Sequence, residues 1–100
     1  MTNFVRNKTW TMTISIQLQY LTQLGESMQL RVGKRRIPME SSFGGLWQIL
    51  LSGRDIQDGD TYTFEVLRDG KVVEREWRGH HYKSPSHGKN IIVRPSWNDR

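Results

Sequence analysis

Apolar and polar residues alternate along much of the chain. Between residues 12 and 20 every second side chain is large and apolar, and the alternation returns over residues 28–32, after the turn at Leu24-Gly25. A period of two is typical of half-buried strands and is not found in amphipathic helices. The apolar run 46–51, which ends at Ser52-Gly53, predicts a further strand that is buried on both faces.

The clearest hairpin surrounds the Asp69-Gly70 pair. Alternating apolar residues over 62–66 lead up to this pair, and the second strand continues to Trp77. Asp-Gly supplies the two positions with positive φ that a tight hairpin turn needs. With a last strand over residues 90–94, the sequence predicts seven or eight short strands and no helix. This pattern favours an all-β fold, either an antiparallel β-sandwich or an open barrel.

The strand pattern divides the chain into a short leader and one module. Residues 1–11 are polar apart from Phe4, Val5 and Trp10, so we expect a leader that is disordered unless Trp10 anchors it. Residues 12–99 hold all the predicted strands and are expected to form a single module. The chain stops soon after its last strand, which suggests a module of a longer protein.

Composition excludes several classes of protein. The 100 residues suffice for one domain, and 35% hydrophobic with 10% aromatic residues is too apolar for a disordered chain. The absence of cysteine excludes disulfides, thiol catalysis and cysteine-based zinc sites. No apolar run reaches the ~18 residues of a membrane helix. Because the leader also lacks the apolar region of a secretory signal, we expect a cytoplasmic protein.

The formal charge of +5 raises the question of nucleic-acid binding. The densest basic cluster is the run 34–36, which is expected in a turn between strands. Most other basic residues alternate with acidic ones, and Asp55, Asp58 and Asp60 in one loop would repel phosphate. A solvated basic surface is therefore the favoured interpretation, and nucleic-acid binding is the weaker alternative.

Candidate catalytic and metal-binding residues are few. His80, His81 and His87 have no carboxylate at a ligand spacing, so we expect exposed loop histidines and no metal or cofactor. Glu74 and Glu76 are two residues apart and could resemble a glycosidase pair, but arginines flank them and make exposed ion pairs the simpler interpretation. No catalytic residue is predicted.

The chain has four tryptophans, which is more than the core of a domain of this size requires. Trp47 lies within an apolar strand, where a core position and a binding position are equally compatible with the pattern. Trp77 follows three charged residues at a strand end, which favours an exposed platform for stacking on a sugar or a base. Trp97, near the end of the chain, is expected to close the sandwich.

The order of these motifs resembles the family 20 starch-binding modules, and the resemblance covers residues 12–99. It rests on the alternating strands and short turn over residues 14–30, on Ile37-Pro38-Met39, Gly45-Leu46-Trp47, residues 62–66, residues 73–77 and residues 96–99. Within that family, the turn 20–27 and the hairpin 68–77 are most similar to N-terminal modules of bacterial 4-α-glucanotransferases. The resemblance implies an immunoglobulin-like sandwich. It also implies a module that holds α-1,4-glucan or a maltooligosaccharide beside a catalytic domain in the same, longer chain.

The resemblance also implies candidate binding residues. In the family's first site, two tryptophans stack on glucose beside a lysine. Trp77 matches the second tryptophan, the loop that carries the first is shortened here, and Glu65 occupies the lysine position. In the second site Trp47 matches a family tryptophan, Leu24 stands where a tyrosine is usual, and Phe43 lies nearest the other aromatic residue. Trp77 is therefore expected to be the main platform.

Both sites look half-retained, and this leaves two functions open for a chain that is not itself expected to be an enzyme. One aromatic stack is worth only ~1–3 kcal/mol, which predicts weak glucan binding. The alternative is a structural or dimerising module of the same enzyme, with degenerate sugar sites, that forms an oligomer.

Overall fold

The computed structural model describes residues 12–99, which form nine strands and one 3₁₀ turn. The elements are β1 (Thr13–Gln19), β2 (Glu26–Val32), β3 (Arg35–Pro38), β4 (Glu40–Ser41), the 3₁₀ turn η2 (Phe43–Gly45), β5 (Leu46–Ser52), β6 (Thr61–Arg68), β7 (Lys71–Arg75), β8 (His80–His81) and β9 (Asn90–Val93). The predicted all-β fold is confirmed. The count exceeds seven or eight because β4 and β8 have two residues each, too few to give an alternating pattern.

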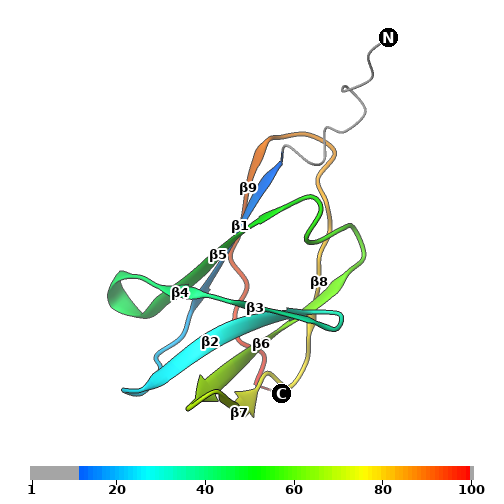
Figure 1. The fold of residues 1–100 in the computed structure, drawn as a ribbon. Coiled ribbons are helices and arrows are strands. Elements are labelled where there is room, and N and C mark those ends of the chain that lie inside the picture. The colour runs from blue at the N-terminus through cyan, green and yellow to red at the C-terminus, as the bar shows by residue number, and fades with distance from the viewer. Residues whose placement is uncertain (1–11, 100) are drawn as a thin grey trace.

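The strands form two sheets that face each other as a sandwich (Figure 1). One sheet has the order β4-β5-β1-β9, and its β1–β9 pair is parallel. The other has the order β3-β2-β6-β7, with β8 paired to the start of β6. The remaining strand pairs are antiparallel. Figure 1 shows the C-terminal end of the chain beside β7, a neighbourhood that matters for the candidate site.

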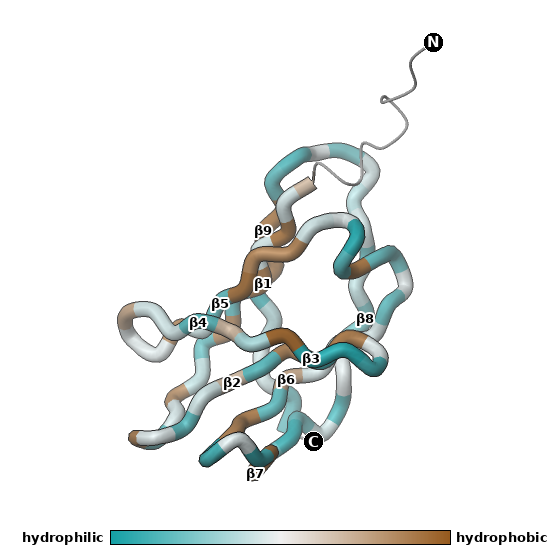
Figure 2. The backbone as a smooth tube through the Cα atoms, in the orientation of Figure 1, coloured by the Kyte–Doolittle hydropathy of each residue, from teal (hydrophilic) through white to brown (hydrophobic). Residues whose placement is uncertain are grey.

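The core lies between the sheets and is built by the predicted alternation. The inward residues of β1, Ile14, Ile16 and Leu18, are at most 1% exposed, while the residues between them are half-buried. β2 and β6 contribute their alternate residues in the same way, and the hydrophobic stretches of β5, β1 and β9 run together in Figure 2. Full burial of each such side chain stabilises the fold by roughly 1.5–3 kcal/mol.

The prediction that the run 46–51 is buried on both faces is wrong. Trp47, Ile49 and Leu51 of β5 are buried, but Leu50 is 70% exposed. In a two-sheet sandwich only one face of each sheet is covered, so a continuous apolar run still leaves alternate residues in solvent.

The β6–β7 hairpin has the predicted turn but a different register. Asp69 and Gly70 have φ of 54° and 77°, as a two-residue hairpin turn of this type requires. The register then shifts by one residue, because Leu67 pairs with Val72 whereas Val66 pairs with Glu74. Val73 is thus the extra residue of a β-bulge, and the bulge reverses which side chains of the second strand face the core.

Three smaller expectations concern the basic run, the last strand and the leader. The expectation that the run 34–36 lies in a turn holds only for Lys34 and is wrong for Arg35 and Arg36, which belong to β3. The last strand, β9, begins where the sequence predicts it and ends one residue earlier. The expected leader, with its anchoring role for Trp10, lies outside the described residues. Among residues 12–99 there is no helix with the length and apolarity to cross a membrane.

Candidate carbohydrate-binding surface

Trp77 lies on the short segment that joins β7 to β8, and its side chain is 63% exposed, as predicted. Its backbone N–H does not continue the β6–β7 ladder but donates to the carbonyl of Asn98, with an N···O distance of 2.9 Å. The side-chain amide of Asn98 in turn donates to the carbonyl of Arg78 at 3.0 Å. The backbone of this exposed tryptophan is therefore fixed against the C-terminal segment.

Glu76, directly before Trp77, is buried and organises that segment. Its Oε1 accepts a hydrogen bond from the N–H of Phe64 at 3.2 Å, and its Oε2 accepts one from the N–H of Asn98 at 2.7 Å. Oε2 also lies 2.6 Å from His80 Nε2. The expectation of an exposed ion pair is wrong for Glu76, because the bulge at Val73 turns its side chain inward, opposite Phe64. A buried carboxylate is tolerated because its oxygens are occupied.

His80 also departs from the prediction of an exposed loop histidine, since it lies in β8 and its side chain is only 14% exposed. The imidazole stacks on the ring of Tyr62, with centroids 5.1 Å apart and planes at 16°. Burial, with the charge of Glu76 as the second cause, raises the pKa of Tyr62 to about 12. His81 is exposed, and the described residues contain no group of three side chains that could hold a metal ion.

Gly79 lets the Trp77 segment lie directly on β6. A Cβ at this position would lie 2.8 Å from Thr63 Oγ1 and 3.1 Å from the carbonyl oxygen of Tyr62. Both distances are shorter than ordinary contacts, so any larger residue would displace the segment or its neighbour. The close approach depends on glycine.

The end of the chain is fastened beside the platform by an aromatic pair. Trp97 packs against the core, as predicted, and stacks on Tyr20 with ring centroids 4.4 Å apart. The Tyr20 hydroxyl donates to Glu74 Oε1 at 2.7 Å. Burial of Tyr20 and, next, its hydrogen bond to Glu74 raise the pKa of this hydroxyl to about 12.

A second exposed apolar group surrounds η2 and the β1–β2 turn. Phe43 is 96% exposed, Leu24 97% and Leu21 84%. The two loops adjoin, since Tyr20 N–H donates to the carbonyl of Gly45 at 3.0 Å and a Cβ on Gly45 would lie 2.9 Å from Leu21 Cδ2. Adjacent exposed apolar side chains of this kind mark candidate contact surfaces.

Trp47 is not part of that surface. It lies in β5, pairs across the sheet with Leu18 and Ser41, and is only 7% exposed within the core. The structure therefore separates Trp47 from Phe43, although only three residues lie between them in the sequence.

Glu65 lies on the outer face of the second sheet, where it is fully covered by its own neighbours. Oε2 accepts a hydrogen bond from Arg75 Nε and Oε1 accepts one from Gln29 Nε2, both at 2.7 Å. Arg36 and Arg31 lie at 3.5 and 4.0 Å. Burial alone would raise the pKa of this carboxyl. The hydrogen bonds from Arg75 and Gln29 and the nearby guanidinium charges outweigh burial and hold the pKa below its ordinary value.

Comparison with known proteins finds likeness in structure only. The sequence matches no known family, and no curated protein is significantly similar to it. The fold is similar to part of a gamma-CGTase from alkalophilic Bacillus clarkii, with 19% identity, a TM-score of 0.69 and coverage of 87% of this chain and 15% of that one. It is also similar to part of a family 15 glucoamylase from Hypocrea jecorina, with 15% identity, a TM-score of 0.65 and coverage of 87% and 17%. A glucoamylase from Hormoconis resinae gives 16% identity, a TM-score of 0.62 and coverage of 89% and 18%. This chain therefore spans less than a fifth of each of these enzymes, and shares a fold with that part of them.

Proposed function

We propose that this chain is a non-catalytic module that binds α-glucan by stacking a glucose ring on Trp77. The observation that carries the proposal is a tryptophan that is 63% exposed and whose backbone is nevertheless tied to Asn98. Because the backbone is already fixed, less conformational freedom of the chain is lost when a ligand binds. The fold shared with parts of two glucoamylases and a CGTase supports α-glucan as the ligand.

Phe43 is the second contact in this proposal. Its exposed ring, with Leu21 on the adjoining loop, would meet another part of the same glucan or a second glucan chain. Glu65 supports the surface indirectly, by holding Arg75 in β7, and Trp47 supports it from the core beneath η2. With each of the two aromatic contacts worth ~1–3 kcal/mol and a millimolar Kd corresponding to about 4 kcal/mol, we expect binding of short oligosaccharides in the millimolar range.

The parent protein in this proposal is a 4-α-glucanotransferase. The support is the sequence resemblance of the turn 20–27 and the hairpin 68–77 to the N-terminal modules of such enzymes. The module would hold α-1,4-glucan near a catalytic domain elsewhere in the longer chain.

Affinity electrophoresis in gels that contain glycogen or amylose tests the proposal. We expect the chain to be retarded, the Trp77→Ala variant to lose the retardation, and maltoheptaose to change the tryptophan fluorescence of the wild type. His87→Ala is the matched control, since it removes another exposed ring from a distant loop. Unretarded migration of the wild type, with unchanged fluorescence, would show that the chain does not bind glucan. Retardation should barely respond to salt, whereas binding to nucleic acid would fall steeply with salt.

A structural or dimerising module is the alternative, and one feature favours it. On the outer face of the first sheet, Leu50 and Ile92 are 70% and 57% exposed and both pair with Ser15 between them. This apolar row could meet a second copy of the chain. Sedimentation coefficients that rise with protein concentration, and that stop rising in Leu50→Ser, would support this function.

A further inference from the structure

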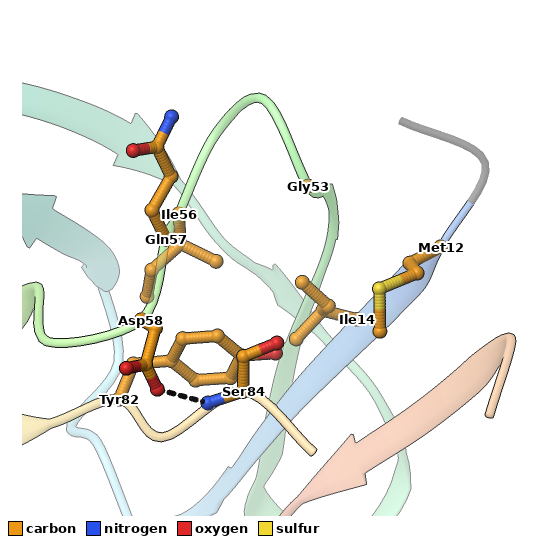
Figure 3. Close-up of a pocket in the computed structure, with 8 residues that line it drawn as sticks. All are labelled: Met12, Ile14, Gly53, Ile56, Gln57, Asp58, Tyr82 and Ser84. Carbon is orange, nitrogen blue, oxygen red and sulfur yellow. Dashed lines mark hydrogen bonds between the residues drawn. The ribbon is translucent and has the colours of Figure 1, made fainter. Parts of the chain in front are cut away.

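A pocket of about 270 Å³ lies at the end of the sandwich away from Trp77. It opens between the start of β1, the β5–β6 connection and the segment after β8, and Figure 3 shows its lining side chains coming from these three places. β1 runs from this pocket toward the opposite end of the sandwich. There Tyr20, directly after β1, stacks on Trp97. The pocket therefore does not overlap the platform proposed above. Its volume corresponds to on the order of ten water molecules, enough for one sugar ring.

Tyr82 is the feature of this pocket that calls for a ligand. The residue is 3% exposed, and its hydroxyl makes no hydrogen bond to any group in the described part of the chain. Its backbone is fixed, since its N–H donates to Asp60 O and its carbonyl accepts from Gly59 N–H, both at 2.8 Å. Leaving a buried hydroxyl unpaired costs roughly 1–3 kcal/mol. Such groups are nearly always paired in folded proteins, with the chain, with ordered water or with a ligand, so the Tyr82 hydroxyl has a hydrogen bond to offer to a group outside the described chain.

The rest of the lining is apolar on its walls and polar at its rim. Ile14 and Ile56 face each other across the pocket in Figure 3. Asp58 Oδ1 accepts a hydrogen bond from Ser84 N–H at 2.7 Å, while Oδ2 has no hydrogen-bond partner in the described residues. The Ser84 hydroxyl also borders the space. A fitting ligand has apolar C–H faces, hydroxyls that donate to Asp58, and an oxygen that pairs with the Tyr82 hydroxyl.

We propose that this pocket binds one neutral pyranose ring, such as the end residue of a glucan chain or a free hexose. A pyranose combines C–H faces with hydroxyls that both donate and accept, and the charge of Asp58 disfavours anionic sugars. The choice of glucose among pyranoses rests on the proposed function. The argument for a neutral pyranose rests only on the chemistry of the pocket lining. The Tyr82 oxygen is covered by the lining, so contact with a ligand requires the lining to shift. Met12, an unbranched and adaptable side chain, is the wall residue with most freedom to move.

The test is a titration of the full chain with D-glucose, followed by the backbone amide signals of Asp58 and Ser84 in ¹H–¹⁵N spectra. We expect saturable shifts of these signals, and affinity about three- to tenfold lower in Tyr82→Phe, which removes only the hydroxyl. Because the hydroxyl is unpaired, the same variant should be no less stable than the wild type. D-glucuronate should bind more weakly than glucose, and Asp58→Asn, whose amide oxygen can still accept from Ser84, should narrow that difference.

Three results would overturn the proposal. The first is no saturable shift at about 100 mM glucose, far above a millimolar Kd. The second is equal affinity of Tyr82→Phe and wild type. The third is that cyclohexanol binds with the same affinity as glucose, which would show that the pocket selects only for apolar surface. The platform is tested separately, since Trp77→Ala should abolish glycogen retardation and leave the glucose-induced shifts at Ser84 unchanged. Failure of either proposal is therefore recognisable without the other.

Discussion

The carboxylate of Glu76 accepts a hydrogen bond from the backbone N–H of Asn98, with an O···N distance of 2.7 Å. In return, the carbonyl of Asn98 accepts one from the N–H of Trp77 at 2.9 Å. These two bonds join the residue that precedes the exposed tryptophan, and the tryptophan itself, to the end of the described chain. The position of the proposed platform is therefore set by a buried acidic group and the C-terminal segment, in addition to the backbone bond from Glu76 N–H to the Phe64 carbonyl.

Replacing this acidic group should loosen the platform. Glu76→Gln keeps the shape of the side chain but turns one acceptor oxygen into a donor NH₂ group, which must face Phe64 N–H on one side or Asn98 and His80 on the other. Such a mismatch in a buried site costs about 1–3 kcal/mol of unfolding free energy. Urea unfolding measures this loss, and gel retardation by glycogen should weaken together with it.

Glu74→Gln is the matched control, since this carboxylate lies two residues before Glu76, in β7, and is exposed. Its carboxylate accepts one exposed hydrogen bond, from Tyr20, which an amide oxygen can also accept. We expect less than about 1 kcal/mol of change. Equal losses in the two variants would contradict the organising role of Glu76.

The contact of Gly79 with β6 gives a second prediction. In Gly79→Ala the new Cβ would meet Thr63 Oγ1 at 2.8 Å, so the segment that carries Trp77 or the threonine side chains of β6 must shift. Overpacking of this kind costs ~1–3 kcal/mol, which thermal unfolding should show as a lower Tm. Adding Thr63→Ala removes the oxygen that is struck and should restore part of the Tm. A double variant no more stable than Gly79→Ala would show that the strain lies elsewhere.

The strands were predictable because their alternation is local, but the site was not, because one bulge decides it. An unbulged turn at Asp69-Gly70 would place Phe64 opposite Arg75, so that Glu74 and Glu76 face solvent. With Val73 as an extra residue, Phe64 instead lies opposite Glu76, whose N–H donates to the Phe64 carbonyl. Nothing in the sequence of this hairpin signals the bulge, and so the buried acid beside Trp77 could not be foreseen.

The tryptophans show the same limit. The polar residues before Trp77 predicted its exposure correctly, but not for the expected reason, because Glu76 is buried and the shifted register turns Trp77 outward. Trp47 stands in an apolar run where both faces look alike, and only the pairing of β5 with β1 and β4 turns it inward. Tyr82 follows a strand of two residues that depends entirely on β6 for its place, so its pocket left no pattern in the sequence.

Acid should weaken the fold through Glu65. Because its pKa is held below the ordinary value in the folded chain, the unfolded chain binds more protons once the pH falls below about 5. The stability that this carboxylate contributes is complete near neutral pH and is lost as the pH falls through the lowered pKa. Urea unfolding from neutral to acidic pH should show this loss, and it should be smaller in Glu65→Gln. Identical pH profiles of the two proteins would mean that the carboxylate and its arginines contribute nothing in this range.

Alkali should weaken the fold through Tyr20, with the opposite sign. Its hydroxyl has a pKa of about 12 in the folded chain, above the ~10 of an exposed tyrosine, so the folded state holds its proton more tightly. The resulting stability is complete below about pH 10 and is lost as the pH rises through the folded value. Tyr20→Phe keeps the ring that stacks on Trp97 and removes the proton. We expect this variant to lose less stability between neutral and strongly alkaline pH than the wild type. Tyr62, whose pKa is also about 12, would account for part of the loss that remains.

A titration of tyrosinate absorbance in both proteins measures this directly. The variant should show one fewer hydroxyl that ionises at strongly alkaline pH than the wild type. The contrary result would be that the hydroxyl absent from the variant titrates in the wild type like that of an exposed tyrosine. The hydrogen bond from Tyr20 to Glu74 would then not hold the turn before β2 against β7.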